Sequence, residues 1–468
     1  MTDPEILKDL KELEKSSRRS NLSIRNRLLS ILHDHSYLVN LRNAVFKEFD
    51  VLFIPNERCG LWYLKHDEFP ATCYFKSTDG HTGQWDFSTR RLNFHLLPLL
   101  ASHDALVIVD STRSGKKMSD AFSRTIPIWC SILGKMISPE LSWNQLLFVP
   151  SVVSTMERET IIKKLDVLYE KFLGLDLSIP VPKPLRPFRP VWISPGSLID
   201  ASAVRELLNL ETQQFQPLFL VTASKACPDG EDKMAAYTYV QGAADDHESW
   251  SRGLDSQMFW NHVECFSDVL TDESMVVSNV VRLVDSARLA SSPVQTIVSG
   301  CTAFWDTTDV TQITSQIFLG KLQDQLPHHI DVNWKSNDFT LVVVLDESIV
   351  ASTPHCASYP LTSGSKKSSR QLRKELPKIM NLIKSVLYAD DSNRIILLCG
   401  DGSDLSVGVL LACLCMYYNE NWTYRLDSPN INKVDKVQIH RHLARIVEKR
   451  RVNPSRATLN SVNYVLMS

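Results

Sequence analysis

The sequence has no long hydrophobic run, no cysteine pair at metal-ligand spacing and no excess of charge of either sign. Its longest apolar stretch, residues 407–418, is well short of the roughly 20 residues that a membrane-spanning helix needs. The 10 cysteines include no C-x-x-C pair, which argues against a zinc ribbon and a disulfide framework. Residues 1–15 lack the apolar core of a signal peptide. We therefore expect a soluble, cytoplasmic protein that does not bind a membrane.

The formal net charge of −2 excludes the overall basic field that is typical of nucleic-acid-binding proteins. Any contact with RNA must then come from local patches. Two basic patches are present, at residues 8–27 and 433–456. A solvated helix face has the same composition, so the sequence leaves both interpretations open.

The chain has the length of two to three domains and the composition of a folded protein, with 468 residues of which 44% are hydrophobic and 22% charged. At residues 326–338 a proline, two histidines and polar residues precede a new apolar strand. This break predicts a first domain over 1–330 and a second over 335–468. Strands alternate with helices in both, so the predicted fold class is α/β.

Two elements of the first domain stand out. Ser154-Thr155-Met156-Glu157 has the form of a capping box, and apolar residues at helical spacing follow it. We expect a long helix there. Residues 105–109 form an apolar strand that ends in Asp110, and α/β sheets carry functional loops at such strand ends.

The most specific pattern of the second domain is an apolar strand over 394–399, followed by a loop with two glycines and an apolar helix. Backbone N–H groups in such a loop, together with the positive end of the helix dipole, bind an anion of phosphate size. The residues that we assign to this anion loop are Cys399, Gly400, Asp401, Gly402, Ser403, Asp404 and Ser406.

This loop resembles the phosphate loop of dual-specificity and tyrosine phosphatases, which consists of Cys, five residues, Arg, then Ser or Thr. Cys399, Gly402 and Ser406 match, but Leu405 stands at the position of the Arg and Leu398 at that of the preceding His. Without the Arg, a phosphate loses its bidentate partner and the thiolate loses a neighbouring positive charge. We expect a phosphatase-like fold without phosphatase activity. A tight turn made of ordinary turn residues is the alternative.

Three segments of the first domain, at residues 75–93, 107–117 and 239–250, have many polar side chains among aromatic ones. The second is a strand that ends in a carboxylate, followed by hydroxyls, a glycine and three cations, which suits a phosphorylated sugar. It resembles the loop with which phosphoribosyltransferases bind phosphoribosyl pyrophosphate. It differs in having Ser111 for the second acid and a loop that is one residue shorter.

The chain from about residue 16 onward resembles the initiator tRNA phosphoribosyltransferase family of fungi and plants. The resemblance rests on these three segments in this order, on residues 190–197 and on the phosphatase-like tail. The resemblance implies transfer of 5-phosphoribosyl from phosphoribosyl pyrophosphate to the 2′-hydroxyl of the adenosine at position 64, in the T stem of initiator methionine tRNA. The modified tRNA would be kept from elongation and reserved for initiation. No obligate protein partner is evident.

Displacement at the ribose C1 carbon needs cations for the leaving pyrophosphate, a group for the attacking hydroxyl, and carboxylates near the sugar or Mg²⁺. We assign Asp110 to ribose or metal, and Asp79 or His81 to the hydroxyl. Asp245 and Asp246 are assigned to Mg²⁺. The residues assigned to substrate binding are Lys76, Arg90, Arg91, Ser111, Thr112, Arg113, Gly115, Lys116 and Lys117.

Simpler explanations exist for several of these residues. A turn histidine explains His81 equally well, and pairing with Asp86 explains Arg90 and Arg91 equally well. A solvated loop is the commoner explanation for the acidic run 245–248. Two other functions also stay compatible with the sequence. One is a non-catalytic RNA-binding protein with inherited phosphate loops, and the other is a phosphatase-like phosphoesterase, which Leu405 disfavours.

Overall fold

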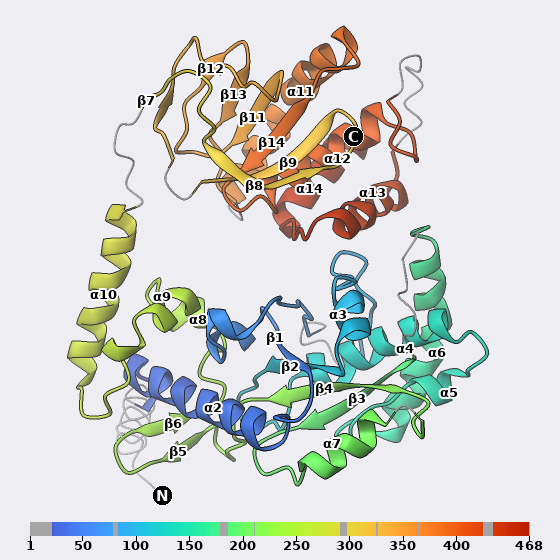
Figure 1. Cartoon of the computed structure of the whole chain (residues 1–468), viewed down its shortest axis with the longest axis vertical. Coiled ribbons are helices and arrows are strands. Elements are labelled where there is room, and N and C mark those ends of the chain that lie inside the picture. The colour runs from blue at the N-terminus through green and yellow to red at the C-terminus, as the bar shows by residue number, and fades with distance from the viewer. Residues whose placement is uncertain are drawn as a thin grey trace, which may run out of the picture. The chain divides into compact units, whose positions relative to one another are not determined.

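Two β-sheets, each with its own helices, organise the chain (Figure 1). The structure is a computed structural model that describes residues 21–77, 83–177, 186–209, 211–290, 297–323, 326–363, 366–424 and 434–467. It divides into two compact units, the first of residues 1–87, 93–171 and 180–287 and the second of residues 88–92, 172–179 and 288–468. Both units mix helices and strands, so the predicted α/β class is confirmed.

The first unit contains a four-stranded sheet in the order β1-β2-β4-β3. Every neighbouring pair is parallel, so the carboxyl ends of the four strands lie at one edge. β2 and β4 are buried along their whole length, as expected for central strands of a parallel sheet. The strands are β1 (Val51–Pro55), β2 (Ala105–Asp110), β3 (Phe188–Ile193) and β4 (Gln216–Thr222).

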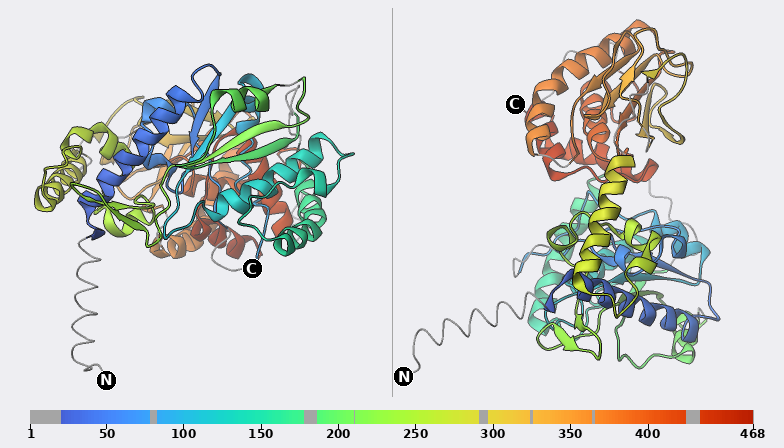
Figure 2. Two further views of the ribbon diagram at one scale, coloured as in Figure 1. Left: turned by 90° about the horizontal axis from the view of Figure 1, so that it is seen from below. Right: turned by 90° about the vertical axis from the view of Figure 1, so that its left-hand side faces the viewer.

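Helices cover this sheet because their apolar residues recur on one face. Val107 and Val109 of β2 belong to one buried cluster with Leu28 and Ile31 of α2, which lies along this face (Figure 2). The helices of this unit are α2 (Ile24–Ala44), α3 (Leu96–Ser102), α4 (Ile126–Ile137), α5 (Trp143–Leu146), α6 (Thr155–Leu173), α7 (Ala201–Leu208), α8 (His247–Trp250), α9 (Ser256–Asn261) and α10 (Glu273–Ala290).

The predicted long helix is confirmed as α6, and its start has the expected cap. The Ser154 hydroxyl accepts a hydrogen bond from the Glu157 N–H at 3.2 Å.

A short antiparallel pair, β5 (Glu231–Lys233) and β6 (Thr238–Val240), lies outside the main sheet. None of the described helices combines the length and apolar character that crossing a membrane requires.

The second unit contains a six-stranded sheet in the order β12-β13-β11-β14-β9-β8. Its central strands β11, β14 and β9 are parallel, and β8 and β12 are antiparallel to their neighbours. The strands are β8 (Trp305–Gln312), β9 (Ile317–Leu322), β11 (Leu341–Leu345), β12 (Ser352–Thr353), β13 (Cys356–Tyr359) and β14 (Ile395–Cys399), and β7 (Ile297–Val298) pairs with β10 (His329–Ile330) outside the sheet.

This sheet corrects the predicted boundary at 330–335. Ile317 of β9 lies opposite Ile395 of β14, so residues well before 330 belong to the second unit. The division falls near Ala287 instead. The polar break at 326–338 is therefore a connection within the second unit.

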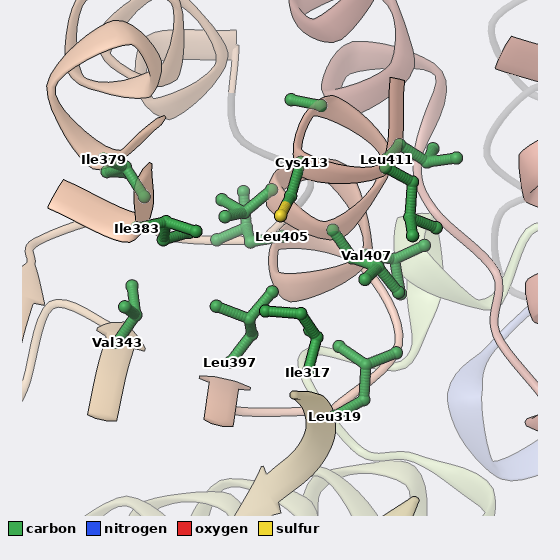
Figure 3. Packing of buried hydrophobic residues seen from close by; sticks show 14 of the residues in the cluster. Ile317, Leu319, Val343, Ile379, Ile383, Leu397, Leu405, Val407, Leu411 and Cys413 are labelled. Atoms are coloured by element: carbon green, nitrogen blue, oxygen red, sulfur yellow. The ribbon is translucent and has the colours of Figure 1, made fainter. Parts of the chain in front are cut away.

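The core of the second unit forms between the sheet and α12 (Leu405–Tyr417), which is apolar on all sides and almost wholly buried. Figure 3 shows Leu405, Val407 and Leu411 of this helix near Ile317 and Leu397 of the strands. The other helices of the unit are α11 (Lys366–Ala389), α13 (Lys436–Lys449) and α14 (Arg456–Met467).

Candidate active site

A cluster of charged side chains lies at the carboxyl edge of the first sheet, where β1 and β2 end. Asp110 is 0% exposed. Arg58, from the turn after β1, donates from Nε to Asp110 Oδ2 and from Nη2 to Asp110 Oδ1, both at 3.2 Å. Its Nη1 donates to Asp245 Oδ1 at 2.6 Å, and Nη2 also donates to the Ser111 carbonyl. One guanidinium therefore joins two strand ends to the segment that carries Asp245.

Three further side chains donate to the Asp110 carboxylate. They are Asn56 Nδ2 at 3.2 Å, Ser119 Oγ at 2.9 Å and Cys59 Sγ at 2.9 Å. Because both oxygens are already hydrogen-bonded inside the protein, Asp110 is placed to hold Arg58 and not to contact a sugar or an ion. Its assignment to ribose or metal does not fit this placement.

The electrostatics of the cluster follow from burial and from these pairs. Burial alone lowers the pKa of the Arg58 guanidinium, but Cys59 and the carboxylates of Asp110 and Asp245 raise it by more, so the net shift is upward. Burial raises the pKa of Asp245, and the charge of Arg58 opposes that shift. Arg58 is thus a permanent cation at the base of the site.

In the loop after β2, the cationic residues are exposed to solvent and the hydroxyl-bearing residues are buried. Arg113, Lys116 and Lys117 are exposed, whereas Ser111 and Thr112 are buried. The Ser111 hydroxyl lies 3.0 Å from that of Tyr63. The Thr112 carbonyl accepts from Ser224 Oγ at 3.0 Å. The cations are therefore placed to meet a ligand, while the two predicted substrate hydroxyls lie inside the fold.

Asp245 and Asp246 do not fit a magnesium site built by the protein. Asp245 is paired with Arg58, and the exposed Asp246 forms an ion pair with Arg113. No group of three or more His, Cys, Asp or Glu side chains suited to a metal occurs in the part of the chain that the structure describes. Each carboxylate neutralises an arginine instead.

Five further predicted residues are Lys76, Asp79, His81, Arg90 and Arg91. Asp79 and His81 lie outside the described residues. Lys76 is exposed and follows Phe75, whose N–H donates to Asn56 Oδ1 at 2.8 Å beside β1. Arg90 and Arg91 belong to the segment 88–92, which is grouped with the second unit. Asp86, their suggested partner, pairs with Lys171 at 2.7 Å.

Sequence reasoning missed Asn56, Arg58 and Gln241. Asn56 directly follows the apolar strand 51–55 and Arg58 comes two residues later, at the same kind of strand end that pointed to Asp110. Asn56 is 0% exposed and donates to both the Phe75 carbonyl and the Asp110 carboxylate. Polar residues just after each parallel strand would have been the signal to follow.

Comparison with known proteins assigns the family. Residues 17–285 match the family described as "Rit1 N-terminal domain", and residues 355–466 match the "Rit1 DUSP-like domain". A Saccharomyces cerevisiae protein named tRNA A64-2'-O-ribosylphosphate transferase is 38% identical, over 99% of this chain and 96% of that protein. This chain belongs to the Rit1 family.

Further similarities extend to a second yeast and to solved phosphatases. An uncharacterized Schizosaccharomyces pombe protein is 32% identical, over 95% of this Rit1 chain and 94% of its own length. The Cydia pomonella PTP-2 phosphatase is 15% identical, over 33% of this chain and 89% of its own, with a TM-score of 0.24. The Chaetomium thermophilum Yvh1 phosphatase domain is 19% identical, over 27% and 77%, with a TM-score of 0.21.

The loop after β14 in the DUSP-like part of this Rit1 chain holds one of its own carboxylates. Asp401 Oδ1 accepts from the N–H groups of Ser403 at 2.9 Å and Asp404 at 3.2 Å, and from the Cys399 thiol at 3.1 Å. These N–H groups belong to the predicted anion loop. Since they already bind an anionic oxygen, the loop does not present them to a phosphate.

The same loop is unsuited to phosphatase chemistry. Leu405, at the position of the phosphatase arginine, is 3% exposed and packs into the core (Figure 3). Burial, and then the charge of Asp401, raise the pKa of Cys399 to about 11. A thiol at neutral pH is a poor nucleophile. Both observations support the expectation that this Rit1 domain does not hydrolyse phosphoesters.

Part of the second basic patch is committed to the fold. Arg450 has a side chain that is 8% exposed, pairs with Asp309 at 2.6 Å and donates to the Gly402 carbonyl at 3.3 Å. Lys449 Nζ donates to the Ile313 carbonyl at 2.9 Å. Residue 433 and most of the first patch lie outside the described residues. The number of Lys and Arg residues in the patch is therefore larger than the number of cations that this Rit1 chain can present to RNA.

Proposed function

We propose that this protein is a tRNA-modifying pentosyltransferase that transfers a ribosylphosphate group to the 2′-hydroxyl of adenosine 64. The observation that carries the proposal is the similarity, across both parts of the chain, to the Saccharomyces cerevisiae transferase. We further propose that the acceptor is initiator methionine tRNA, that the donor is phosphoribosyl pyrophosphate and that the protein works in the cytoplasm.

The loop after β2 supports a phosphorylated donor. Arg113, Lys116 and Lys117 are exposed within five consecutive residues, at the carboxyl edge of a parallel sheet. Charged hydrogen bonds from such side chains to phosphate oxygens are strong, and cations stabilise the charge that a leaving pyrophosphate gains. The cations of this loop therefore match the leaving group of the proposed donor.

In the proposed reaction, the bond between C1 of the ribose and the pyrophosphate oxygen breaks with its electron pair. The 2′-oxygen of the tRNA forms the new bond to C1, and its proton passes to a base. We keep Asp79 and His81 as the proposed groups for that hydroxyl. Asp110 acts through Arg58, which it fixes beside the loop.

Magnesium remains an expectation of this proposal. Asp245 and Asp246 are paired with arginines, which argues against an ion held by carboxylates of the protein. We propose instead that the ion arrives bound to the phosphate oxygens of the donor, as Mg²⁺ commonly does on nucleotides. Affinity for tRNA would come mostly from cations that meet backbone phosphates, because a duplex stem offers few readable base edges.

The test is a transfer assay with purified protein, unmodified initiator tRNA, phosphoribosyl pyrophosphate and Mg²⁺. We expect mass spectrometry to find one phosphoribosyl increment on a T-stem fragment, with elongator methionine tRNA unmodified in the same assay. Tight tRNA binding without any increment would overturn the proposal and favour a non-catalytic RNA-binding protein.

A further inference from the structure

Gln241, the first residue after β6, holds the cationic loop by its backbone. Its side-chain oxygen Oε1 accepts hydrogen bonds from the N–H groups of Gly115 and Cys227, both at 2.9 Å. Its Nε2 donates to the Lys116 carbonyl at 2.7 Å. The residue is 2% exposed, so water does not compete for these bonds. A buried amide thus fixes two consecutive residues of an otherwise exposed loop.

The neighbouring residues add contacts to the same loop. A Cβ atom on Gly242, whose φ is +64°, would lie 2.6 Å from the Thr112 carbonyl oxygen and 2.9 Å from the Arg113 nitrogen. Only glycine permits such a close approach of two backbones. The segment 241–246, which begins at Gln241 and ends at the exposed partner of Arg113, therefore follows the loop along its length.

Position matters for this loop because its cations have long, flexible side chains. Ordering a flexible loop when a ligand binds costs conformational entropy, whereas a loop that is ordered beforehand does not carry that cost. Gly115 has a φ of +72°, and because glycine populates positive and negative φ about equally, its own conformational preference does not fix this backbone. The bond from its N–H to Gln241 holds it in place.

We propose that Gln241 is a positioning residue for the donor site, which orders the backbone of residues 115–116 so that Arg113, Lys116 and Lys117 are presented to the pyrophosphate group before the donor binds. This inference rests on the proposed function, since it concerns the donor of that reaction. Gln241 does not touch the donor and acts only through the loop.

The test compares Gln241→Met, which keeps the length of the side chain and removes its three hydrogen bonds, with a matched control. Gln216 is also a buried glutamine that bonds a backbone carbonyl, that of Leu100 at 2.5 Å, but it lies at the amino end of β4, away from the site. Gln216→Met therefore reports the general effect of losing such a bond.

We expect Gln241→Met to raise the KM for phosphoribosyl pyrophosphate about tenfold or more, with the tRNA Kd unchanged. Gln216→Met should leave that KM within twofold. Inorganic pyrophosphate at a fixed concentration should raise the melting temperature of Gln216→Met as much as that of the wild type, and that of Gln241→Met by clearly less. A folded Gln241→Met protein with the KM and the pyrophosphate response of the wild type would overturn the inference.

Two further arms keep the result interpretable. If Gln241→Met does not fold, Gln241→Glu retains the acceptor for both N–H groups, while its ionised form replaces the bond to the Lys116 carbonyl by a repulsion between two oxygens. It should still raise the donor KM, and a normal KM would overturn the inference. A wild type that binds pyrophosphate but transfers nothing to tRNA would refute the proposed function, whereas normal transfer with an unaffected Gln241→Met would refute only this inference.

Discussion

The Arg58 guanidinium and the Asp110 carboxylate meet in a two-point hydrogen bond, Nε to Oδ2 and Nη2 to Oδ1, each at 3.2 Å. Asp110 is fully buried, and Arg58 has only 23% of its side chain exposed. The pair joins the turn after β1 to the start of the cationic loop. A buried charge pair at this point makes the geometry of the loop depend on both partners.

Asp110→Asn tests that dependence. The substitution keeps the shape of the side chain but removes one of the two carboxylates that pair with the Arg58 guanidinium, and breaking a buried pair commonly costs about 3–5 kcal/mol. We expect the free energy of unfolding, measured in urea, to fall by about 3 kcal/mol, and transfer activity to fall with it. An Asp110→Asn protein as stable as the wild type would contradict this role.

Asp246→Asn should have the opposite effect on the donor. Its carboxylate pairs with Arg113 in an exposed ion pair and therefore competes with a donor phosphate for the same guanidinium. Exposed pairs contribute about 0–1 kcal/mol, so the donor KM should fall by at most about fivefold. The difference should shrink as salt is added. Asp232→Asn, in the exposed pair with Lys225, is the control and should leave the donor KM unchanged.

Cys399 should be inert. With a pKa of about 11, about one thiol in a thousand is ionised at pH 8, and the side chain is also buried. We expect iodoacetamide to modify the exposed Cys301 first, with Cys399 labelled only in denatured protein. No turnover of p-nitrophenyl phosphate should occur. Labelling of native Cys399 as fast as Cys301 would show that the loop opens.

The buried Asp34 should make stability depend on pH. Burial raises its pKa to about 6 from an ordinary value of 3.8, while hydrogen bonds from His33 and Tyr239 partly oppose the shift. Its Oδ2 has no hydrogen-bond partner among the described residues. Between pH 4 and 6 the unfolded chain releases this proton and the folded chain retains it, so stability falls as the pH rises.

Asp34→Asn removes that titration and keeps an acceptor for the Tyr239 hydroxyl, which donates to Asp34 at 2.8 Å. The wild type should lose about 2.4 kcal/mol relative to the variant between pH 4 and 7.5, because the shift of about two pKa units is worth about 3 kcal/mol and part of it is already lost at pH 4. Urea unfolding at several pH values measures the difference. Parallel pH profiles for the two proteins would contradict the assignment.

The elements that the sequence predicted correctly have local signals. β2 is a short apolar run and α6 begins at a capping box, and both patterns lie within a few neighbouring residues. The boundary near Ala287 has no such signal, because β9 joins the second sheet through β14, which follows it only after a long stretch of chain.

Prediction of the site from the sequence is limited in the same way, to residues that are close along the chain. The exposed cations of the loop were visible in the sequence because they are neighbours. The partners that place them were not, because Arg58 bonds a residue 52 positions away and Gln241 one 126 positions away. The bond that the Cys399 thiol donates to the Asp401 carboxylate spans only two residues, but the composition of the loop does not tell whether its N–H groups are open to a ligand or already bonded to Asp401. Composition identifies charges, and only the fold decides which of them face water.

Gly242→Ala tests the close contact that holds the loop. The added Cβ would lie 2.6 Å from the Thr112 carbonyl oxygen, and neither backbone can move without disturbing Arg113 or Gln241. Gly196→Ala is the matched control, because Gly196 has a φ of +89° but nothing within 4 Å of a Cβ, so it reports backbone strain alone. The control should lose about 1 kcal/mol of stability and keep the donor KM. Gly242→Ala should lose more stability than the control and raise the donor KM, because steric overlap adds to the strain. If the two variants behaved alike, in urea unfolding and in kinetics, strain alone would explain the glycine and the contact with the loop would have no part in donor binding.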